Sequence, residues 1–318
     1  MTAASSLLVT GAAGFIGARL SAALLASERA FDRLILADRS APVATNDPRV
    51  VIRAGDMTDP QFVRSLVTPD VRVVFHLAGI VSGAAEADLD AGLRTNIDGT
   101  RHLLDACRAL PEPARVIYAS SIAVYGAPLP VHIDDGTLPA PTLSYGTQKL
   151  VCEQLINDFT RRGLIDGRTL RLPGIVVRPP QPNGALSAFN SDIIREPLAG
   201  RAMTSPVSPQ ATIWVMSIDQ CVRNFLLALR LPRATLGGQR ALLLPAVAVS
   251  IEEILDAVSR ASGRDGRALV RYAPDPHLEE MFGRWPRALD AERARGLGFA
   301  ADVSIDAIVA AYRRDAKR

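Results

Sequence analysis

The chain has 318 residues, of which 48% are hydrophobic, and its formal net charge at pH 7 is only +3. This composition excludes an intrinsically disordered chain, and the small, dispersed charge does not predict nucleic-acid binding. No apolar run is long enough to span a bilayer, and no basic region precedes the short apolar stretch near the N-terminus. We therefore expect a soluble, cytoplasmic, globular protein with one large core or two modest cores, and with no nucleic-acid or membrane partner.

The first half of the chain alternates short apolar runs with amphipathic segments. The apolar runs, which are typical of buried parallel strands, lie at residues 7–10, 34–37, 50–52, 73–77, 116–119 and 168–172. Apolar residues at helical spacing occur at residues 16–25, 61–66, 97–110 and 145–162. This alternation predicts an α/β fold with a doubly wound, Rossmann-type parallel sheet over residues 1–174.

The composition changes after Gly174. The residues that break regular structure there are Pro179, Pro180, Pro182, Asn183 and Gly184, so we expect no helix to cross them. Beyond them, short strand and helix patterns occur at residues 213–215, 222–229, 242–244, 251–262 and 305–312. We predict a smaller, mixed α/β lobe over residues 175–318, from which some strands and helices return to the first domain.

Cysteine and histidine spacing argues against metal or redox chemistry. Cys107, Cys152 and Cys221 are odd in number and widely spaced, without a C-x-x-C pair, so we expect buried free thiols. The histidines, at positions 76, 102, 132 and 277, show no metal-ligand spacing. We predict no metal site.

A glycine-rich turn follows the first predicted strand. The sequence T-G-A-A-G-F-I-G places Gly11, Gly14 and Gly17 at a spacing that differs from the standard dinucleotide fingerprint. Glycines still allow positive φ angles and a close approach of the backbone to a ligand, while N–H groups at the helix start, at Phe15 and Ile16, can bind a pyrophosphate. A purely structural turn, with Gly17 required only for helix packing, is the alternative.

Carboxylates follow the second and third predicted strands. Asp38 lies about 20 residues beyond the helix start, where it can accept hydrogen bonds from ribose hydroxyls and repel a 2′-phosphate. This predicts NAD rather than NADP as the cofactor, although the adjacent Arg39 can partly accommodate that phosphate. Asp56, which precedes Met57, is placed to meet the adenine amino group. For Asp38, an ordinary carboxylate at a strand end is the alternative.

Tyr145 and Lys149 form a second candidate site. Lys149 is the only lysine before the C-terminal tail of an arginine-rich chain, which indicates a role that a guanidinium performs badly. On a helix, a spacing of four residues puts both side chains on one face, where the ammonium can stabilise the phenolate form of Tyr145. A chance pairing on an amphipathic helix is the alternative.

Several motifs together resemble the extended short-chain dehydrogenase/reductase family, which includes NAD-dependent epimerases and dehydratases. They are T-G-A-A-G-F-I-G, D-M at 56–57, H-L-A-G at 76–79, N-I-D-G-T at 96–100, S-S-I-A-V-Y-G at 120–126 and Y-G-T-Q-K at 145–149. Each motif is weak alone, whereas their order over roughly residues 5–230 leaves little room for coincidence.

The resemblance implies a role for each matching residue. Tyr145 would be the general acid/base, Lys149 would support its phenolate and hold the nicotinamide ribose, and Ser121 would hydrogen-bond the reacting oxygen. The further cofactor contacts that it implies are backbone contacts of Leu77, Ala78 and Gly79, structural or water-mediated support from Asn96, and cover of the nicotinamide by Pro173. A surface serine is the alternative for Ser121.

The resemblance also implies a homodimer that pairs through the helices beginning near residues 97 and 145. The apolar side chains that we expect to supply this interface are Leu103, Leu104, Leu155 and Phe159.

Substrate identity depends on the second lobe. Residues 178–201 do not match nucleotide-sugar enzymes well and resemble instead the subgroup that oxidises a four-carbon sugar acid, D-erythronate, to its 2-oxo acid with NAD. The substrate contacts that we expect, besides Ser121 and Tyr145, are a carboxylate clamp by Arg178 or Arg195, hydroxyl contacts by Ser187 and Asn190, and a pocket wall at Trp214.

Alternatives remain open at the substrate end of the site. Each arginine can equally be structural, and Trp214 can be an ordinary core residue. A nucleotide-sugar 4-epimerase or dehydratase and a non-catalytic NAD-binding regulator are the competing functions.

Overall fold

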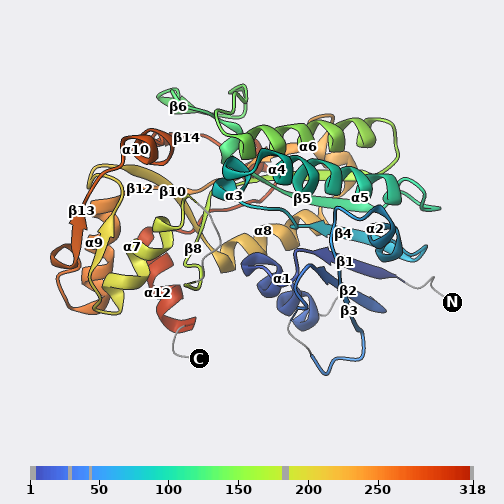
Figure 1. Cartoon of the computed structure of the whole chain (residues 1–318), viewed down its shortest axis with the longest axis horizontal. Helices are drawn as coiled ribbons and strands as arrows, with labels where there is room; N and C mark the ends of the chain where they lie inside the picture. The colour runs from blue at the N-terminus through green and yellow to red at the C-terminus, as the bar shows by residue number, and fades with distance from the viewer. Residues whose placement is uncertain (1–4, 28–30, 43–44, 181–185, 316–318) are drawn as a thin grey trace. The chain divides into compact units, whose positions relative to one another are not determined.

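The computed structural model describes residues 5–27, 31–42, 45–180 and 186–315 (Figure 1). They form two compact units. Unit 1 comprises residues 1–124, 143–171 and 222–242, and unit 2 comprises residues 125–142, 172–221 and 243–318. One of the passages of the chain between the units lies between Arg171 and Leu172, close to the predicted domain boundary after residue 174. The predicted helix-breaking residues Pro182, Asn183 and Gly184 lie outside the described residues.

Unit 1 is built on a seven-stranded sheet. Its strands are β1 (Ser6–Thr10), β2 (Arg33–Asp38), β3 (Val50–Ala54), β4 (Val71–His76), β5 (Arg115–Ser121), β7 (Asp166–Leu172) and β11 (Ala241–Leu243). They lie in the order β11-β7-β5-β4-β1-β2-β3, and β1 pairs in parallel with both β2 and β4. Because the strand order reverses between β1 and β4, their carboxyl ends border the crevice where such sheets bind ligands.

Helices cover both faces of this sheet, with α1 and α8 on one side and α5 and α6 on the other (Figure 1). The helices of unit 1 are α1 (Phe15–Ala26), α2 (Pro60–Leu66), α3 (Ser82–Ala87), α4 (Leu89–Gly92), α5 (Gly99–Cys107), α6 (Ser144–Arg161) and most of α8 (Ile218–Arg230). A π-helical segment, Leu93–Asp98, joins α4 to α5, and 3-10 turns follow β5 and α8 at Ile122–Val124 and Arg233–Leu236. The predicted doubly wound Rossmann-type fold is therefore confirmed.

The elements of unit 2 are shorter. They are β6 (His132–Ile133), β8 (Gly174–Val176), α7 (Phe189–Leu198), β9 (Met203–Ser205), β10 (Thr212–Ser217), β12 (Val247–Ser250), α9 (Ile251–Ser262), a 3-10 turn (Arg267–Leu269), β13 (Val270–Tyr272), α10 (Pro276–Phe282), β14 (Ala288–Leu289), α11 (Glu292–Gly296) and α12 (Ile305–Asp315). Strand β10 pairs antiparallel with β12 and parallel with β8, which makes the predicted mixed α/β lobe.

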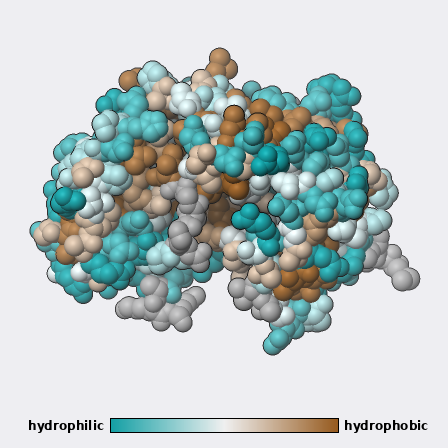
Figure 2. All heavy atoms as spheres, viewed as in Figure 1, coloured by the Kyte–Doolittle hydropathy of each residue, from teal (hydrophilic) through white to brown (hydrophobic). Residues whose placement is uncertain are grey.

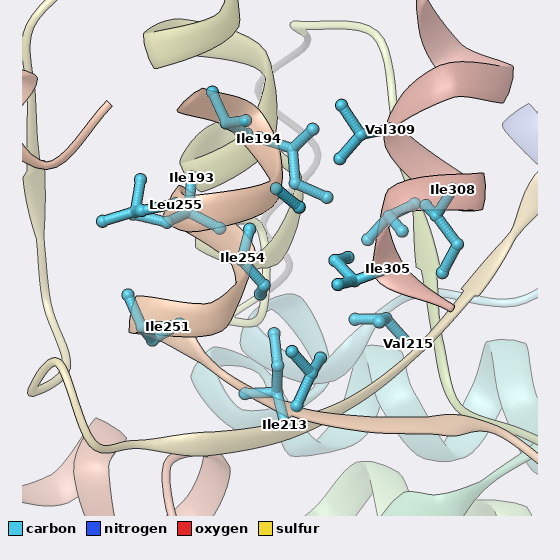
Figure 3. Packing of buried hydrophobic residues seen from close by; sticks show 14 of the residues in the cluster. Ile193, Ile194, Ile213, Val215, Ile251, Ile254, Leu255, Ile305, Ile308 and Val309 are labelled. Atoms are coloured by element: carbon cyan, nitrogen blue, oxygen red, sulfur yellow. The ribbon is translucent and has the colours of Figure 1, made fainter. Parts of the chain in front are cut away.

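The core of unit 2 lies where α7, α9 and α12 meet β10. Figure 3 shows Ile193 and Ile194 of α7, Ile254 of α9 and Val309 of α12 pointing toward one another above Ile213 of β10. Helix α9 begins at a reciprocal capping box of Ser250 and Glu253, and its last residue, Ser262, is followed by the C-cap Gly263, whose φ is +73°. These local signals account for the agreement of the predicted helix at 251–262 with α9.

Two expectations about helices need correction. The helix predicted at 97–110 is α5, which ends at Cys107 and is preceded by the π-helical segment and by α3 and α4. Leu103 and Leu104 are fully buried in the unit 1 core, so they cannot form a dimer interface. Leu155 and Phe159 are partly buried against the same core.

Cys107, Cys152 and Cys221 are free and buried, as predicted. Burial raises the pKa of the Cys107 thiol to about 12, which makes it a poor nucleophile at neutral pH. Among the described residues, no helix is both long enough and apolar enough to cross a membrane. Within the same ranges, no cluster of His, Cys, Asp and Glu is arranged to hold a metal ion.

Candidate active site

The glycine turn connects β1 to α1 in close contact with the segment after β4. Gly11 has a φ of +73°, and a Cβ atom there would lie 2.7 Å from the backbone of Leu77 and Ala78. A Cβ atom at Gly17 would collide with the carbonyl oxygen of Gly11. Gly14 occupies the N-cap position and has no side chain to cap α1. The half-buried Phe15 and Ile16 begin this helix, so its first N–H groups remain available to an anion.

Asp38 lies at the end of β2 beside this turn. One carboxylate oxygen accepts a hydrogen bond of 3.0 Å from the backbone N–H of Ala13, and the other accepts one of 3.3 Å from Ser40. Asp38 therefore braces the turn as well as presenting a negative charge at the strand end. Asp56 is exposed and caps its own loop by accepting from Thr58 N–H at 2.8 Å.

Met57 is buried in the unit 1 core, so only its backbone is left for a cofactor contact. Its carbonyl oxygen lies 3.4 Å from a ring nitrogen of His102.

Asn96 clamps the segment after β4 to helix α6. Its side-chain oxygen accepts from Ile80 N–H at 2.9 Å, and its nitrogen donates to Gln148 Oε1 at 2.7 Å. A Cβ atom on Gly79 would lie 2.7 Å from that Asn96 oxygen and 3.9 Å from Lys149 Nζ. Only a residue without a side chain fits at position 79, because any Cβ atom there would collide with Asn96. The support role of Asn96 stays a prediction.

Tyr145 and Lys149 lie on one face of α6. Lys149 is 4% exposed, and its ammonium donates to the carbonyl oxygen of Ala119 at 2.7 Å. The same nitrogen lies 5.6 Å from the centroid of the half-buried Tyr145 ring and 4.6 Å from that of Tyr118. Because an ammonium has three donors and Ala119 uses one, the others can serve the tyrosine and a bound ligand.

Ser121 is the last residue of β5, two residues beyond the apolar run predicted at 116–119, and its side chain is partly exposed. Its hydroxyl oxygen accepts from Ala123 N–H at 3.1 Å, which leaves its proton free to be donated elsewhere. Helix α6 packs against β5 and the 3-10 turn after it. Ser121, Tyr145 and Lys149 therefore all belong to unit 1 and lie on two elements that pack against each other.

The predicted substrate residues other than Ser121 and Tyr145 lie in unit 2, and two of them have structural roles. Arg195 is 8% exposed and forms ion pairs with Asp192 and Glu196, while it also donates to the carbonyl oxygen of Arg178. This guanidinium is already neutralised, so it is a weaker carboxylate clamp than predicted. Trp214 is 1% exposed, and its indole N–H donates to Pro286 O at 2.7 Å. It is a core residue, contrary to the predicted pocket wall.

The other unit 2 candidates keep some capacity for a ligand. Arg178 is partly exposed and donates through Nε to Ile175 O at 3.3 Å. Ser187 is partly exposed, and its carbonyl oxygen accepts from the N–H of Asn190. The side-chain oxygen of Asn190 is buried and has no hydrogen-bond partner among the residues that the structure describes. Pro173 is buried immediately after β7.

A model of the NAD dependent epimerase/dehydratase family matches residues 7–240. The chain belongs to this family. It is an oxidoreductase of the extended short-chain dehydrogenase/reductase type that uses a nicotinamide cofactor.

Similar proteins cover nearly the whole chain. D-erythronate dehydrogenase of Cupriavidus necator is 42% identical over an alignment of 319 positions, which covers 98% of this chain and 98% of the relative. D-erythronate dehydrogenase of Haemophilus influenzae is 38% identical over 95% of this chain and 96% of its own. The crystal structure of a nucleoside-diphosphate-sugar epimerase from Agrobacterium tumefaciens is 37% identical, with a TM-score of 0.92 over 98% of this chain and 94% of that one.

The geometry of unit 1 fits the dinucleotide of this epimerase/dehydratase family. A pyrophosphate needs free N–H groups and a close approach of the backbone, which the start of α1 and Gly11 supply. A ribose needs a hydrogen-bond acceptor, which the carboxylate of Asp38 supplies. Gly79 lies on the Lys149 side, where the backbone without a side chain would meet the nicotinamide end.

A buried hydrogen-bond chain that the sequence reasoning missed runs through the same crevice. His76 ends β4, and its ring nitrogens lie 2.7 Å from Thr10 Oγ1 and 2.9 Å from Thr100 Oγ1. Thr100 in turn donates to the carbonyl oxygen of Asn96 at 2.6 Å. Only the H-L-A-G match pointed toward His76, because a histidine without ligand spacing gives no other signal in a sequence.

The free energy of unfolding should depend on pH through His76. Burial, with a smaller effect of the Lys149 charge, lowers the pKa of His76 from 6.5 to about 3. The ring therefore stays neutral in the folded protein, whereas the unfolded chain takes up its proton below pH 6.5. We expect this single group to cost roughly 2–3 kcal/mol of stability between pH 7 and pH 4.5.

Denaturant unfolding of His76→Gln, followed by far-UV circular dichroism, checks this expectation. The variant should be less stable at pH 7 but should lose less stability on acidification than the parent. The exposed His277 offers a control, since His277→Gln should leave the acid-dependent loss in place. An identical pH dependence in the parent and His76→Gln would contradict the assignment.

Proposed function

We propose that the protein oxidises the C2 hydroxyl of D-erythronate to give 2-oxo-D-erythronate, with NAD as the hydride acceptor. The observation that carries this proposal is the 42% identity to the Cupriavidus necator D-erythronate dehydrogenase over 98% of both chains. The arrangement of Tyr145, Lys149 and Ser121 in unit 1 supports it, because alcohol oxidation needs a base, a cation and a hydroxyl donor beside the reacting carbon.

Three side chains have separate roles in this reaction. Gly11, the start of α1 and Asp38 would hold NAD, which would supply the acceptor for the C2 hydride. Tyr145 Oη, as the phenolate, accepts the proton of the C2 hydroxyl as the carbonyl double bond forms. Lys149 stabilises that phenolate through its ammonium and is itself held by Ala119 O. Ser121 donates its hydroxyl proton to the C2 oxygen and fixes the direction from which the proton leaves.

The substrate carboxylate and hydroxyls need partners of their own. We propose Arg178 for the carboxylate, because its side chain is partly exposed whereas Arg195 is only 8% exposed and faces two acids. The unpartnered side-chain oxygen of Asn190 suits a substrate hydroxyl, which would supply the hydrogen bond that this buried acceptor lacks. Ser187 is proposed as a second hydroxyl contact, and Pro173 as the residue that covers the nicotinamide.

The direct test is NADH formation from purified protein, NAD and a panel of C3 to C6 sugar acids. D-erythronate should give the highest kcat/KM, and mass spectrometry should identify the 2-oxo acid as the product. Activity with another member of the panel and none with D-erythronate would replace the substrate while keeping the reaction class.

A nucleotide-sugar epimerase is the second candidate function, favoured by the likeness to the Agrobacterium tumefaciens structure. An epimerase returns its hydride to the sugar, so no net NADH accumulates. Isothermal titration with UDP-glucose or UDP-galactose distinguishes the two functions. We expect no tight binding, and conversion of one sugar into the other would favour the epimerase instead.

Asp38 should decide the preference for NAD over NADP. In Asp38→Asn the side-chain oxygen can still accept from Ala13 N–H, whereas the charge that repels a 2′-phosphate is gone. We expect the ratio of kcat/KM for NAD to that for NADP to fall roughly 10- to 100-fold. Steady-state kinetics with both cofactors measure this ratio, and a parent enzyme that already prefers NADP would contradict the role of Asp38.

We propose a homodimer that pairs through the face formed by α4, the π-helical segment and α6. Leu89, Leu93 and Val151 are 54%, 38% and 37% exposed there, and Figure 2 shows hydrophobic residues gathered over α4 and α6. Light scattering should give twice the chain mass, and Leu93→Asp should shift it toward the monomer. Val303→Asp, at a residue that is 94% exposed in unit 2, is the control and should leave the measured mass unchanged.

The cytoplasmic location remains a prediction.

A further inference from the structure

A buried carboxylate lies on the same face of α6 as the proposed acid/base pair. Tyr145, Lys149 and Glu153 follow one another at intervals of four residues, so they form one row along the helix. Glu153 is only 2% exposed. An ionised side chain is rarely enclosed to this extent unless its partners compensate for the water it has lost.

Glu153 joins two neighbouring strands of the sheet to the helix. Its Oε1 accepts from the hydroxyl of Ser120 on β5 at 2.5 Å. Its Oε2 accepts from Arg171 Nη2 on β7 at 2.7 Å, while Arg171 Nε donates to Oε1 at 3.1 Å. This two-pronged guanidinium contact is the directional form of an ion pair. Strands β5 and β7 are adjacent in the sheet.

The end of β5 is therefore attached to α6 at two consecutive residues. The carbonyl oxygen of Ala119 accepts from Lys149, and the side chain of Ser120 binds Glu153 one helical turn later. Successive side chains of a strand point to opposite faces, so burial of Ser120 directs Ser121 away from Glu153. Both attachments fix the position from which Ser121 presents its hydroxyl.

We propose that Ser120, Glu153 and Arg171 form a positioning network that sets the end of β5, and with it Lys149 and Ser121, for the reaction. This inference rests on the proposed acid/base function of Tyr145. Apolar side chains could join the same three elements at a lower desolvation cost, so packing alone does not call for a buried ion pair here. Directional bonds to a helix and a strand do supply a fixed geometry.

The charged and titratable groups around this row are few. Strand β5 contributes Tyr118, and β4 contributes His76, which is neutral. Helix α6 itself contributes Cys152, whose thiol pKa is raised by burial, and β7 contributes Arg171. The charged side chains of residues 82–98, which comprise α3, α4 and the π-helical segment and pack against the start of α6, are Glu86, Asp88, Asp90, Arg94 and Asp98. The first four are exposed and Asp98 is partly exposed, and Glu86 accepts from Ser144 N–H. Glu153 and Arg171 are thus the nearest enclosed pair whose charge can be changed.

The test removes the charges of Glu153 and Arg171 one at a time and measures the titration of Tyr145. Glu153 lies eight residues from Tyr145, or about 12 Å along the helix axis. At this separation and an intermediate dielectric, removal of one unit charge shifts the titration midpoint of Tyr145 by about one pH unit. Tyrosinate absorbance of the NAD-bound protein, taken as the difference from the same variant carrying Tyr145→Phe, reports Tyr145 without any substrate. Glu153→Gln should move the midpoint down by about one unit, Arg171→Gln should move it up, and the double variant should return it to the parent value.

Two further variants keep the outcome clear. Ser120→Ala retains both charges and should lower kcat about 10-fold without moving the tyrosinate midpoint. Asp166→Asn breaks the buried ion pair with Arg168 at the opposite end of β7, about 16 Å from Arg171, and should lower stability without affecting either readout.

Two results distinguish failure of the network from failure of the proposed function. A folded Glu153→Gln protein with the parent midpoint, together with full turnover in Ser120→Ala, would overturn the network alone. Loss of the proposed function would instead appear as a Tyr145→Phe variant that turns over D-erythronate like the parent.

Discussion

Replacement of Tyr145 with phenylalanine is expected to lower kcat for D-erythronate oxidation by about 10³-fold, because general acid/base catalysis contributes factors of this size. The ring remains, so the half-buried side chain keeps its packing near Lys149. Affinity for NAD should change little, since the phenol is only one of many contacts along the cofactor. Steady-state kinetics and isothermal titration of NAD measure the two effects separately.

Tyr118 provides a matched control for this substitution. It is also an aromatic hydroxyl close to Lys149, at 4.6 Å from the ring centroid, but it is 1% exposed and cannot meet a substrate. Tyr118→Phe should retain most of the turnover. Equal losses in both variants would place the effect in the packing around Lys149 rather than in proton transfer. Unchanged turnover in Tyr145→Phe would remove the proposed base, and a protein that binds NAD without turnover of any substrate would favour the non-catalytic regulator.

Replacement of Lys149 with methionine is expected to lower kcat/KM by about 10²- to 10³-fold and to weaken NAD binding. Methionine has a similar length but no charge, so the phenolate of Tyr145 and the carbonyl oxygen of Ala119 both lose their cation. The loss of one hydrogen bond at Ala119 costs only about 1 kcal/mol of stability, so the variant should still fold.

Lys149→Arg tests whether charge alone is sufficient. The site is 4% exposed and is shaped around a single nitrogen that donates to Ala119, so a planar guanidinium cannot take the same position. We expect this variant to recover little of the lost activity. Near-parental turnover in Lys149→Arg would contradict the geometric part of the explanation. Pre-steady-state measurement of NADH formation shows whether the loss lies in the chemical step.

The sequence predicted the turn and the element ends at the carboxyl edge of the unit 1 sheet well, because the signals there are local. The turn between β1 and α1 requires glycine at positions 11 and 17, because a Cβ atom at either would collide with the backbone. A sequence shows such a requirement directly, since only glycine meets it. Ser121 was placed at the end of β5 and Tyr145 at the start of α6 by apolar runs of the right length.

Other features of unit 1 depend on contacts that a sequence does not display. Leu103 and Leu104 lie between the charged residues Arg101 and Asp105 in the sequence. Only the packing of α5 on the sheet shows that both leucines are buried. The π-helical segment that presents Asn96 has no propensity signature. Glu153 did have a signal, since it repeats the spacing of four from Tyr145 to Lys149, but an acid on a helix is usually solvated.

Unit 2 was the least predictable part. Its short strands pair across long stretches of chain, as β9 does with β13, so no local alternation marks them. Helix α7 contains Pro197 and was not predicted, although Pro197 lies in its last turn, where the chain is about to leave the helix. Trp214 looked like a pocket residue, whereas its ring packs 4.9 Å from that of Trp285.

The central claim is that C2 of D-erythronate gives up a hydride while Tyr145 removes the hydroxyl proton. The most direct measurement uses D-erythronate labelled with deuterium at C2, unlabelled NAD and mass spectrometry of the reduced cofactor. The account predicts deuterated NADH in the parent enzyme, in amounts equal to the 2-oxo acid, and almost none in Tyr145→Phe. Unlabelled NADH, or release of deuterium to solvent without cofactor reduction, would contradict it.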